Sequence, residues 1–458
     1  MNKQPYAEPW RIKMVEPLKT LSKEQREIKI KEAEYNLFSL DAEDVYIDLI
    51  TDSGTNAMSD RQWSALMLGD ESYAGSRSYL RMKQTIQELL GFEYVMPTHQ
   101  GRAAENVLFS AMLKAKDIVP GNAHFDTTKG HIEFRHATAV DCTVDEVNKM
   151  DSDHPFKGNV DIDKLKACIA EHGVEKIPFM VLTVTCNTGG GQPVSMNNIQ
   201  AVSEICKQHD IPLIFDSARF SENAYFIKTR EDGYQDKSIK EIVKEMFSYA
   251  DGMTMSAKKD AIVNIGGFIG LRSEKIYREC CTFSIMFEGY ITYGGMSGRD
   301  MEAVAAGLIE STEYDYLHAR ISQVKYLGDE ISKLGIPIVK PAGGHAIYVD
   351  AKSFFPQIPQ NQYPAQALGV ALYIEAGVRG VEIGTVLADR DPETRQERTP
   401  KMELLRLAIP RRVYTNNHMD VVAWGLQQIW AKREQYRGLK IKFEAPIMRH
   451  FTATFEVL

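Results

Sequence analysis

The stretch Ile211-Pro212-Leu213-Ile214-Phe215 is a short apolar run that ends at Asp216, and it decides the fold class. Upstream of it, residues 177–185 (IPFMVLTVT) form a second β-rich run, and residues 197–209 carry apolar side chains at helical spacing. Buried strands that alternate with amphipathic helices are typical of a mainly parallel sheet covered on both faces. The sequence therefore predicts an α/β fold for the middle of the chain.

The same alternation continues downstream of Asp216. We expect a helix near residues 239–249 and strands around residues 253–255 and 267–271. In a parallel sheet, ligands gather at the carboxyl ends of the strands. Because Asn187, Asp216 and Lys259 each lie at or just beyond such an end, we expect them to share one crevice.

The C-terminal third of the chain has a different pattern, which predicts a compact α+β unit. Its expected elements are strands over residues 343–350, 404–409 and 451–457 and helices over residues 364–376 and 418–433. A long connecting helix near residues 298–333 precedes it. We therefore expect a second, smaller domain there.

Length and composition limit the class of protein. The 458 residues favour two domains, and the net charge of -8 argues against nucleic acid or an anionic membrane as the main partner. Residues 1–5 have no apolar core of the kind a secretory signal needs, and no apolar run approaches the roughly 20 residues of a membrane helix. The cysteines form no CxxC pair and are best read as reduced thiols: Cys142, Cys168, Cys186, Cys206, Cys280 and Cys281. These features predict a soluble cytoplasmic protein.

The pair Lys258-Lys259 closes an apolar segment that opens at Tyr249. A lysine soon after a buried strand can form an imine with an aldehyde, and a carboxylate such as Asp216 can hold a protonated pyridine nitrogen. Together they meet the minimal requirement for pyridoxal 5'-phosphate (PLP) chemistry. Neither is diagnostic alone, because lysine pairs are usually solvated and an Asp after a strand is often a helix cap.

Residues 98–105 follow a short apolar segment and open a predicted helix. A helix start with Gly101 and Arg102 suits a phosphate, because free backbone N–H groups and the helix dipole point at it. The alternative interpretation is an ordinary strand-to-helix turn with a surface arginine. A PLP lysine downstream favours the phosphate, to which the Ser256 hydroxyl can add a hydrogen bond.

Four further side chains are candidates for the cofactor or the substrate. Phe125 can stack on a pyridine ring, although an aromatic residue there is more often core. Asn187 and Arg219 can reach the phenolic oxygen of the cofactor, although Asn187 is also a good turn residue. Arg406 lies inside the aliphatic run 404–409 and needs a partner, for which a substrate α-carboxylate and a structural ion pair are the alternatives.

Several longer motifs match a known family in order. They are residues 49–55 (LITDSGT), 69–75 (GDESYAG), 97–102 (PTHQGR), 190–195 (GGQPVS), 216–219 (DSAR) and 255–260 (MSAKKD). From about Glu8 to the C-terminus the chain resembles the β-eliminating lyases of the PLP fold-type I superfamily. The resemblance implies an aspartate aminotransferase-like fold with a mainly parallel seven-stranded sheet. It implies an N-terminal arm and part of the small domain in residues 1–55, a large PLP-binding domain in 56–310, and a connecting helix and small domain in 311–458.

The resemblance also implies roles for individual residues. Lys259 matches the residue that binds PLP covalently and removes the α-proton, with Lys258 in support. Asp216 matches the partner of the pyridine nitrogen, and Arg406 matches the arginine that holds the substrate carboxylate. The remaining cofactor residues are matched by Gln100, Gly101, Arg102 and Ser256 at the phosphate, Phe125 on the ring, and Asn187 and Arg219 at the ring oxygen.

Other matches concern the leaving group, a cation and the assembly. Tyr73 matches the acid that protonates the leaving group. Tyr293 matches a residue supplied to a neighbouring subunit's site, which implies a homotetramer with active sites at dimer interfaces. The residues that match a potassium or ammonium site are Gly54, Glu71 and Asn264.

Three positions resemble the members of the family that cleave tryptophan. Members that cleave tyrosine have an arginine in place of Ile383, a threonine in place of Asp126 and a phenylalanine in place of His450. Indole is large and apolar with one N–H donor, so Ile383 and one acceptor such as Asp126 suit it. We expect cleavage of L-tryptophan to indole, pyruvate and ammonium, with Asp126 and His450 assisting at the indole.

Four alternatives remain open. A tyrosine-cleaving enzyme, a general β-eliminase on serine or S-alkyl cysteines, and an aminotransferase would all use the same fold. A catalytically silent binding protein would be expected to lose Lys259 or Asp216, and this chain keeps both.

Overall fold

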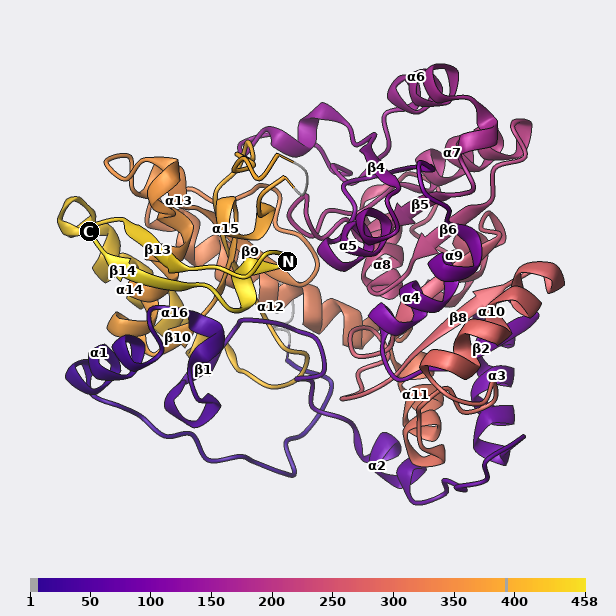
Figure 1. Ribbon diagram of the computed structural model, residues 1–458. Helices are drawn as coiled ribbons and strands as arrows, with labels where there is room; N and C mark the ends of the chain where they lie inside the picture. Colours follow the sequence, from indigo (N-terminus) through magenta and orange to yellow (C-terminus); the bar gives the residue numbers. More distant parts are fainter. Residues whose placement is uncertain (1–6, 392–393) are drawn as a thin grey trace. The chain divides into compact units, whose positions relative to one another are not determined.

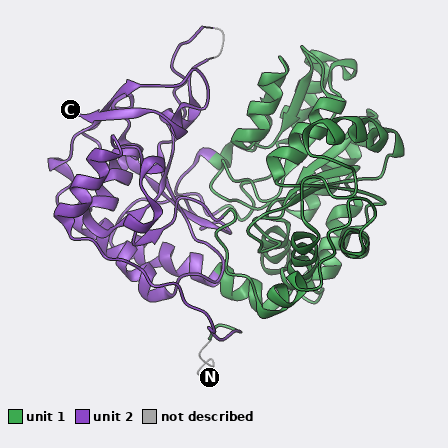
Figure 2. Ribbon diagram, turned by 60° about the horizontal axis from the view of Figure 1, so that its bottom comes forward, with its two compact units in different colours: residues 1–9, 53–147, 154–321 green, residues 10–52, 148–153, 322–458 purple. Residues whose placement is uncertain are grey.

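The computed structural model describes residues 7–391 and 394–458 (Figure 1). Residues 1–5, on which the prediction about export rests, lie outside this range. The chain divides into two compact units (Figure 2). Unit 1 comprises Ser53–Val147, His154–Ile321 and the described residues before Trp10, whereas unit 2 comprises Trp10–Asp52, Asn148–Asp153 and Ser322–Leu458. No helix in the described part of the chain is both long and apolar enough to cross a membrane.

Unit 1 is built on one seven-stranded sheet whose strand order is β2-β8-β7-β6-β5-β3-β4. Its strands are β2 (Tyr94–Thr98), β3 (Ile118–Gly121), β4 (Thr138–Asp141), β5 (Met180–Thr183), β6 (Leu213–Asp216), β7 (Gly252–Ser256) and β8 (Gly267–Leu271). Only β8 runs antiparallel to its neighbours β2 and β7, and the other pairs are parallel. The predicted α/β fold with a mainly parallel sheet is therefore confirmed.

Helices pack around this sheet. They are α2 (Asp60–Leu66), α3 (Arg77–Leu90), α4 (Gly101–Met112), α5 (Asp126–Phe134), α6 (Ile162–His172), α7 (Met196–Gln208), α8 (Phe220–Arg230), α9 (Ile239–Ser248), α10 (Glu274–Phe287) and α11 (Gly298–Glu310). In α7 the side chains of Ile199, Val202 and Cys206 recur at helical spacing and are all buried, while Ser195 caps its first turn. Local sequence and burial thus agree on where this helix lies.

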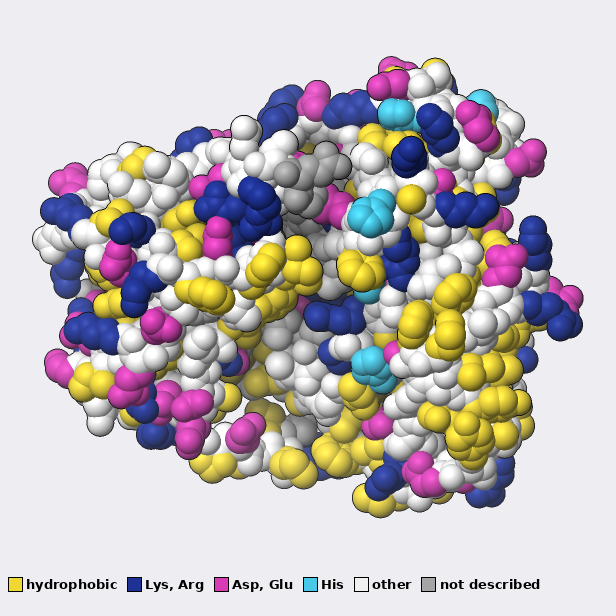
Figure 3. All heavy atoms as spheres, viewed as in Figure 1, with side chains coloured by type: hydrophobic (Ala, Val, Ile, Leu, Met, Phe, Trp, Pro, Cys, Tyr) yellow, Lys and Arg dark blue, Asp and Glu magenta, His cyan; other side chains and the backbone are white. Residues whose placement is uncertain are grey.

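The surface of unit 1 has an apolar region. Figure 3 shows hydrophobic side chains gathered where Figure 1 labels α10 and α3, among otherwise mixed charges. Exposed residues on these two helices are Leu80, Ile285, Met286 and Phe287. Such patches on a folded protein mark surfaces that other molecules cover.

The predicted long helix over residues 298–333 is wrong, because the segment forms two helices. The first, α11, ends at Glu310, and α12 (Tyr314–Lys333) begins after a short break. In that break the Ser311 hydroxyl donates to the carbonyl of Leu308 (2.9 Å), and the Thr312 hydroxyl donates to the carbonyl of Ile309 (2.8 Å). These side chains compete with the helical backbone, which explains the end of α11.

Unit 2 holds the smaller sheets. Its elements are α1 (Lys23–Glu32), β1 (Ile47–Asp48), β9 (Ala346–Asp350), α13 (Ala351–Phe354), α14 (Pro364–Ala376), β10 (Val378–Arg379), β11 (Val381–Ile383), α15 (Thr385–Ala388), β12 (Leu404–Ala408), α16 (Asn416–Trp430), β13 (Leu439–Phe443) and β14 (Thr454–Val457). The strand predicted to start at Phe451 starts later, because residues 449–451 form a 3-10 turn. The strand predicted from Gly343 likewise begins at Ala346.

The sheet β11-β12-β9 of unit 2 has two different faces. One face buries Leu405, Leu407 and Val349 in the main core of the unit. The other face carries a smaller apolar cluster that includes Leu404 and Tyr348. Because side chains alternate along a strand, Arg406 lies on this second face.

Candidate active site

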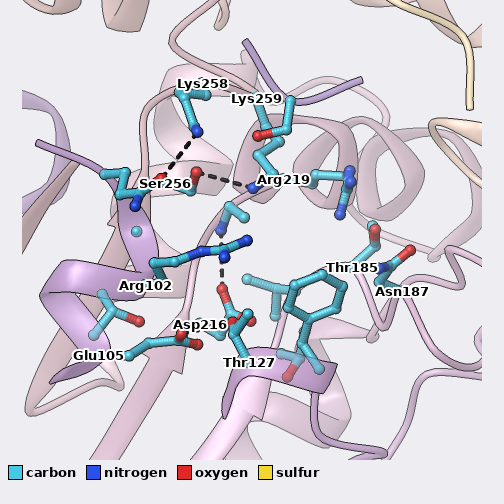
Figure 4. Close-up of a pocket in the computed structure, with 18 residues that line it drawn as sticks. Arg102, Glu105, Thr127, Thr185, Asn187, Asp216, Arg219, Ser256, Lys258 and Lys259 are labelled. Carbon is cyan, nitrogen blue, oxygen red and sulfur yellow. Dashed lines mark hydrogen bonds between the residues drawn. The ribbon is translucent and has the colours of Figure 1, made fainter. Parts of the chain in front are cut away.

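A cavity that opens to solvent lies at the carboxyl edge of the unit 1 sheet. Five strands that run in the same direction, β2, β3, β5, β6 and β7, end there. The predicted cofactor residues that line this cavity are Gln100, Gly101, Arg102, Phe125, Asn187, Asp216, Arg219, Ser256, Lys258 and Lys259 (Figure 4). The structure thus brings together side chains that are up to 159 positions apart in the chain.

One end of the cavity is formed by the start of α4 and the end of β7. A Cβ atom on Gly101 would lie 2.5 Å from the Cβ of Ser256, so only glycine lets the two segments approach this closely. The N-cap residue Gln100 makes no side-chain cap bond. Its Oε1 instead accepts a 3.1 Å hydrogen bond from Nζ of Lys258. Burial and the nearby Arg102 charge lower the pKa of Lys258.

The other lysine of the pair has a different partner. Nζ of Lys259 donates a 2.9 Å hydrogen bond to Oγ of Ser256. Asp216 lies at the end of the neighbouring strand, and the backbone N–H of Ala218 donates to its Oδ1 (3.4 Å). Burial raises the pKa of Asp216, while the charges of Lys259 and Arg219 act in the opposite direction. The opposite charges offset only part of the cost of burying this carboxylate, and its pKa stays raised.

Glu105 is a cavity residue to which the sequence assigned no role. Its Oε2 accepts a 2.7 Å hydrogen bond from the Thr127 hydroxyl, and its Oε1 accepts one from the Thr128 hydroxyl. Burial and the charge of Asp216 raise the pKa of Glu105 to about 7. The signal in the sequence was a glutamate between the apolar pairs Ala103-Ala104 and Val107-Leu108, but its partners lie on another helix, α5.

Arg219 and Phe125 reach the cavity from helix starts. Both are N-cap residues, of α8 and α5 respectively, and neither side chain makes a cap bond. Arg219 is buried, and its backbone N–H donates to the carbonyl of Val184 (3.3 Å). Asn187 is buried in the loop after β5, where its carbonyl accepts from Gly190 (3.0 Å). Residues of unfavourable cap type at both helix starts indicate that their side chains serve the cavity.

The residues of this cavity fit PLP. The start of α4 with Arg102 and the Ser256 hydroxyl offers donors for a phosphate, and the close approach at Gly101 leaves its backbone facing the cavity. Lys259, in the turn after β7, offers an amine, and Asp216, at the end of the adjacent strand β6, offers an anion. This donor set matches a dianionic phosphate, an aldehyde and a pyridine nitrogen.

Tyr73 and Tyr293 lie together, outside the residues that line this cavity. Their ring centroids are 5.1 Å apart, and Tyr73 also stacks on Tyr290 at 5.6 Å. Tyr73 is 68% exposed in the single chain. The charge of Tyr293 is the largest cause that raises the pKa of the Tyr73 phenol.

The predicted cation residues are brought together only in part. The side-chain amide of Asn264 donates to the carbonyl of Gly54 (2.9 Å) and to that of Asn56 (3.2 Å). The carboxylate of Glu71 instead accepts from the backbone of Gly298 (3.0 Å) and from Arg299 (3.1 Å). No cluster of three or more His, Cys, Asp or Glu side chains suited to a metal occurs in residues 7–391 and 394–458.

Arg406 and Ile383 belong to unit 2 and share one face of its sheet. Arg406 pairs with Val381 and Tyr348, and Ile383 pairs with Leu404 in the antiparallel ladder. The guanidinium of Arg406 donates to the carbonyl of Ile50 (3.2 Å). Ile383 packs against the apolar cluster on this face. The predicted carboxylate-binding and leaving-group residues are thus neighbours on adjacent strands.

His450 and Asp126 lie in different units. His450 is buried in the turn before β14, where its ring lies edge-on to Phe38 at 5.9 Å and against Phe451 at 3.8 Å. Asp126 is the first residue of α5, and its Oδ1 accepts from the backbone of Thr127 (2.6 Å).

Known proteins show what this chain is similar to. The model of the family described as "Beta-eliminating lyase" matches residues 48–424. The chain is 61% identical to a "Probable beta-eliminating lyase" of Trichomonas vaginalis, and 99% of each chain is covered. It is 53% identical to a "Tyrosine phenol-lyase" of Symbiobacterium sp., with 99% of each chain covered. It is also 53% identical to a "Tryptophanase" of Salinibacter ruber, with 97% of this chain and 94% of the other covered.

The fold also has solved counterparts. An aromatic aminotransferase from Pyrococcus horikoshii superposes with a TM-score of 0.60 at 15% identity, covering 88% of this chain and 99% of the other. The aminotransferase-like fold expected from the sequence is confirmed by this likeness.

Proposed function

The chain belongs to the family of PLP-dependent β-eliminating lyases, and from that premise we propose that it cleaves L-tryptophan to indole, pyruvate and ammonium. The observation that carries the chemistry is the placement of Lys259 and Asp216 at the ends of adjacent strands in one cavity. When bound there, PLP supplies an electron sink for negative charge on the substrate α-carbon.

Each protein group has a defined task in this proposal. The residues that would hold the cofactor are Lys259, Asp216, Asn187, Arg219 and Phe125, with Lys258 in support. The residues that would bind its phosphate are Gln100, Gly101, Arg102 and Ser256. Nζ of Lys259 takes the α-proton of the substrate as a general base. Arg406 holds the substrate carboxylate through paired charge-assisted hydrogen bonds.

Tyr73 is the proposed donor of the proton that indole needs at C3 before it can leave. The phenol of Tyr73 can supply this proton, because a tyrosine keeps its proton at neutral pH. Asp126 accepts from the indole N–H, and His450 assists on the same ring. Ammonium and pyruvate follow from hydrolysis of the three-carbon product.

The choice of tryptophan rests on local positions rather than on overall identity. The chain is 53% identical both to a tyrosine phenol-lyase and to a tryptophanase, so whole-chain similarity does not separate the two substrates. Ile383 lies in an apolar cluster, paired with Leu404, which suits a large apolar leaving group. Asp126 and His450, like Ile383, resemble the family members that cleave tryptophan.

Tyrosine is the second candidate substrate, and the number of tyrosine phenol-lyases among the relatives favours it. The deciding experiment compares pyruvate release from L-tryptophan and L-tyrosine, with PLP and potassium added. We expect the larger kcat/KM with tryptophan. A larger value with tyrosine would overturn the assignment. L-serine and S-methyl-L-cysteine, run beside them, measure general β-elimination.

The assembly and the cation are also proposals. We propose a homotetramer in which Tyr293 serves a neighbouring subunit, and the exposed apolar residues of α3 and α10 support a covered surface. Gly54, Glu71 and Asn264 are proposed to bind potassium or ammonium. Light scattering, and activity with potassium replaced by sodium, test these two points. A cytoplasmic location stays a prediction.

A further inference from the structure

Asp260 follows Lys259 directly and is almost fully buried, at 1% exposure. It lies in the turn after β7, which carries both lysines of the cavity. The site predicted from the sequence included no role for Asp260. Its contacts connect this turn to the segment that follows the neighbouring strand β6.

The carboxylate of Asp260 gathers three hydrogen bonds on one oxygen. Oδ2 accepts from the backbone N–H of Ser221 (2.7 Å), from the Ser221 hydroxyl (2.6 Å) and from the backbone N–H of Glu222 (3.2 Å). Ser221 and Glu222 are fully buried in the first turn of α8. Asp260 therefore caps α8 from outside the helix.

This external cap compensates for an unusual residue at the start of α8. The N-cap position is normally held by Ser, Thr, Asp or Asn, whose side chain accepts from the first turn. Here Arg219 occupies it and makes no side-chain cap bond. Since Asp260 supplies the acceptor, the Arg219 side chain can line the cavity without leaving the helix start unsatisfied.

The backbone of Asp260 adds a second link. Its N–H donates to the carbonyl of Ala218 (3.3 Å), which lies between Asp216 and Arg219 in the chain. The side-chain and backbone contacts thus join the lysine turn to the Asp216–Arg219 loop on both sides of the α8 start. Residues on these two segments face the same cavity.

We propose that Asp260 is a positioning residue that sets the place of Lys259 relative to Asp216 and Arg219. It acts through the backbone of both loops and does not itself touch the reacting atoms. The inference rests on the proposed function, in which Lys259 binds the cofactor. Loss of the Asp260 carboxylate lets the two loops separate, which misplaces the amine and weakens cofactor binding.

A matched control exists in the same unit. Glu231 also caps a helix from outside, in addition to the Ser195 cap of α7, and accepts from the backbone of Met196 (2.6 Å) and of Asn197 (2.9 Å). It is also buried, and it does not line the cavity. Variants of Glu231 therefore report the loss of a buried helix cap alone.

The experiment compares D260N and D260A with E231Q and E231A in the full-length protein. Equilibrium dialysis gives the dissociation constant for PLP, visible spectra give the bound-cofactor band and its pH dependence, and thermal melts of the cofactor-free protein give stability. Because the amine is misplaced, we expect the dissociation constant to rise about tenfold in D260A, with D260N intermediate. E231Q and E231A should lower the melting temperature and leave the cofactor band unchanged.

The outcomes separate the two proposals. If the wild-type protein binds no PLP, the proposed function fails. If the wild-type binds PLP and D260N matches E231Q in affinity and spectrum, the positioning role of Asp260 is wrong. Should D260A not fold, D260N decides, because it keeps the shape of the side chain and removes only the charge and one acceptor.

Discussion

Nζ of Lys259 donates a 2.9 Å hydrogen bond to Oγ of Ser256, so the proposed cofactor-binding amine rests on a proposed phosphate ligand three residues earlier. Both groups must exchange this partner when PLP enters. The bond holds the amine inside the cavity until then. Nζ of Lys258 donates to Gln100 instead, so the two lysines have different hydrogen-bond partners.

The first prediction concerns these two lysines. K259A should lose covalent attachment of PLP, measured by borohydride reduction and peptide mass, and should lose about a thousandfold in turnover because the general base is gone. K258A should keep the covalent label, since Nζ of Lys258 is bonded to Gln100 at the phosphate end of the cavity. A label that survives in K259A and disappears in K258A would reverse the assignment.

The second prediction concerns the buried carboxyl of Glu105. Its pKa of about 7 in the folded protein exceeds the ordinary value of 4.5. The folded state therefore binds more protons than the unfolded state between these values, and stability falls as pH rises through this window. The free energy of unfolding falls by on the order of 3 kcal/mol at most, which follows from the size of the shift in pKa.

E105Q removes this titration while keeping one acceptor for the threonine hydroxyls. Urea unfolding of the cofactor-free protein at pH 5 and pH 8 should show a smaller loss of stability for E105Q than for the wild type. E241Q is the control. The Ser238 hydroxyl lowers the pKa of Glu241. The stability that the Glu241 carboxylate contributes is therefore lost only as pH falls below this range. Parallel behaviour of E105Q and wild type would contradict the raised pKa.

The third prediction concerns Ile383 and the leaving group. I383R places a cation in the apolar cluster on the face that also carries Arg406, so kcat/KM for tryptophan should fall by about 100-fold. The ratio of tyrosine to tryptophan activity should rise, since a guanidinium can polarise a phenol. I383L is the control for shape and should keep the preference for tryptophan. An unchanged ratio in I383R would remove Ile383 from the specificity argument.

The fourth prediction concerns Tyr73 as a proton donor. Y73F should lower kcat for tryptophan by about 100-fold or more, because indole needs a proton to leave. S-methyl-L-cysteine has a better leaving group, so its turnover should fall far less. Y290F is the matched control, since Tyr290 stacks on Tyr73 without the proposed role. Equal losses on both substrates would contradict proton donation.

The sequence predicted elements mainly in the middle and C-terminal parts of the chain, and the errors there have physical causes. The helix over residues 364–376 was predicted with its observed ends, because Pro364 opens it and Gly377 closes it in a left-handed conformation. The break after α11 was missed because Ser311 and Thr312 are compatible with a helix by pattern. Only their bonds to backbone carbonyls end it.

The candidate site was predicted less evenly. Strand ends revealed Asp216 and Lys259, since a parallel sheet places such residues at one edge. Glu105 and Asp260 were assigned no role because their partners, Thr127 and Ser221, lie in segments that only the folded chain brings near. The spacing of residues along the chain does not predict such contacts.

The antiparallel strand β8 determines when the cavity can form during synthesis. Strand β2 pairs with β8 and with no other strand of the seven-stranded sheet, and β8 is the last of the seven in the chain. Strand β2, which leads into the start of α4, therefore has no place in the sheet until residues 267–271 have left the ribosome. A nascent chain shorter than this exposes the edge of β7. Premature termination within this stretch would consequently yield a chain that aggregates rather than one that binds PLP weakly.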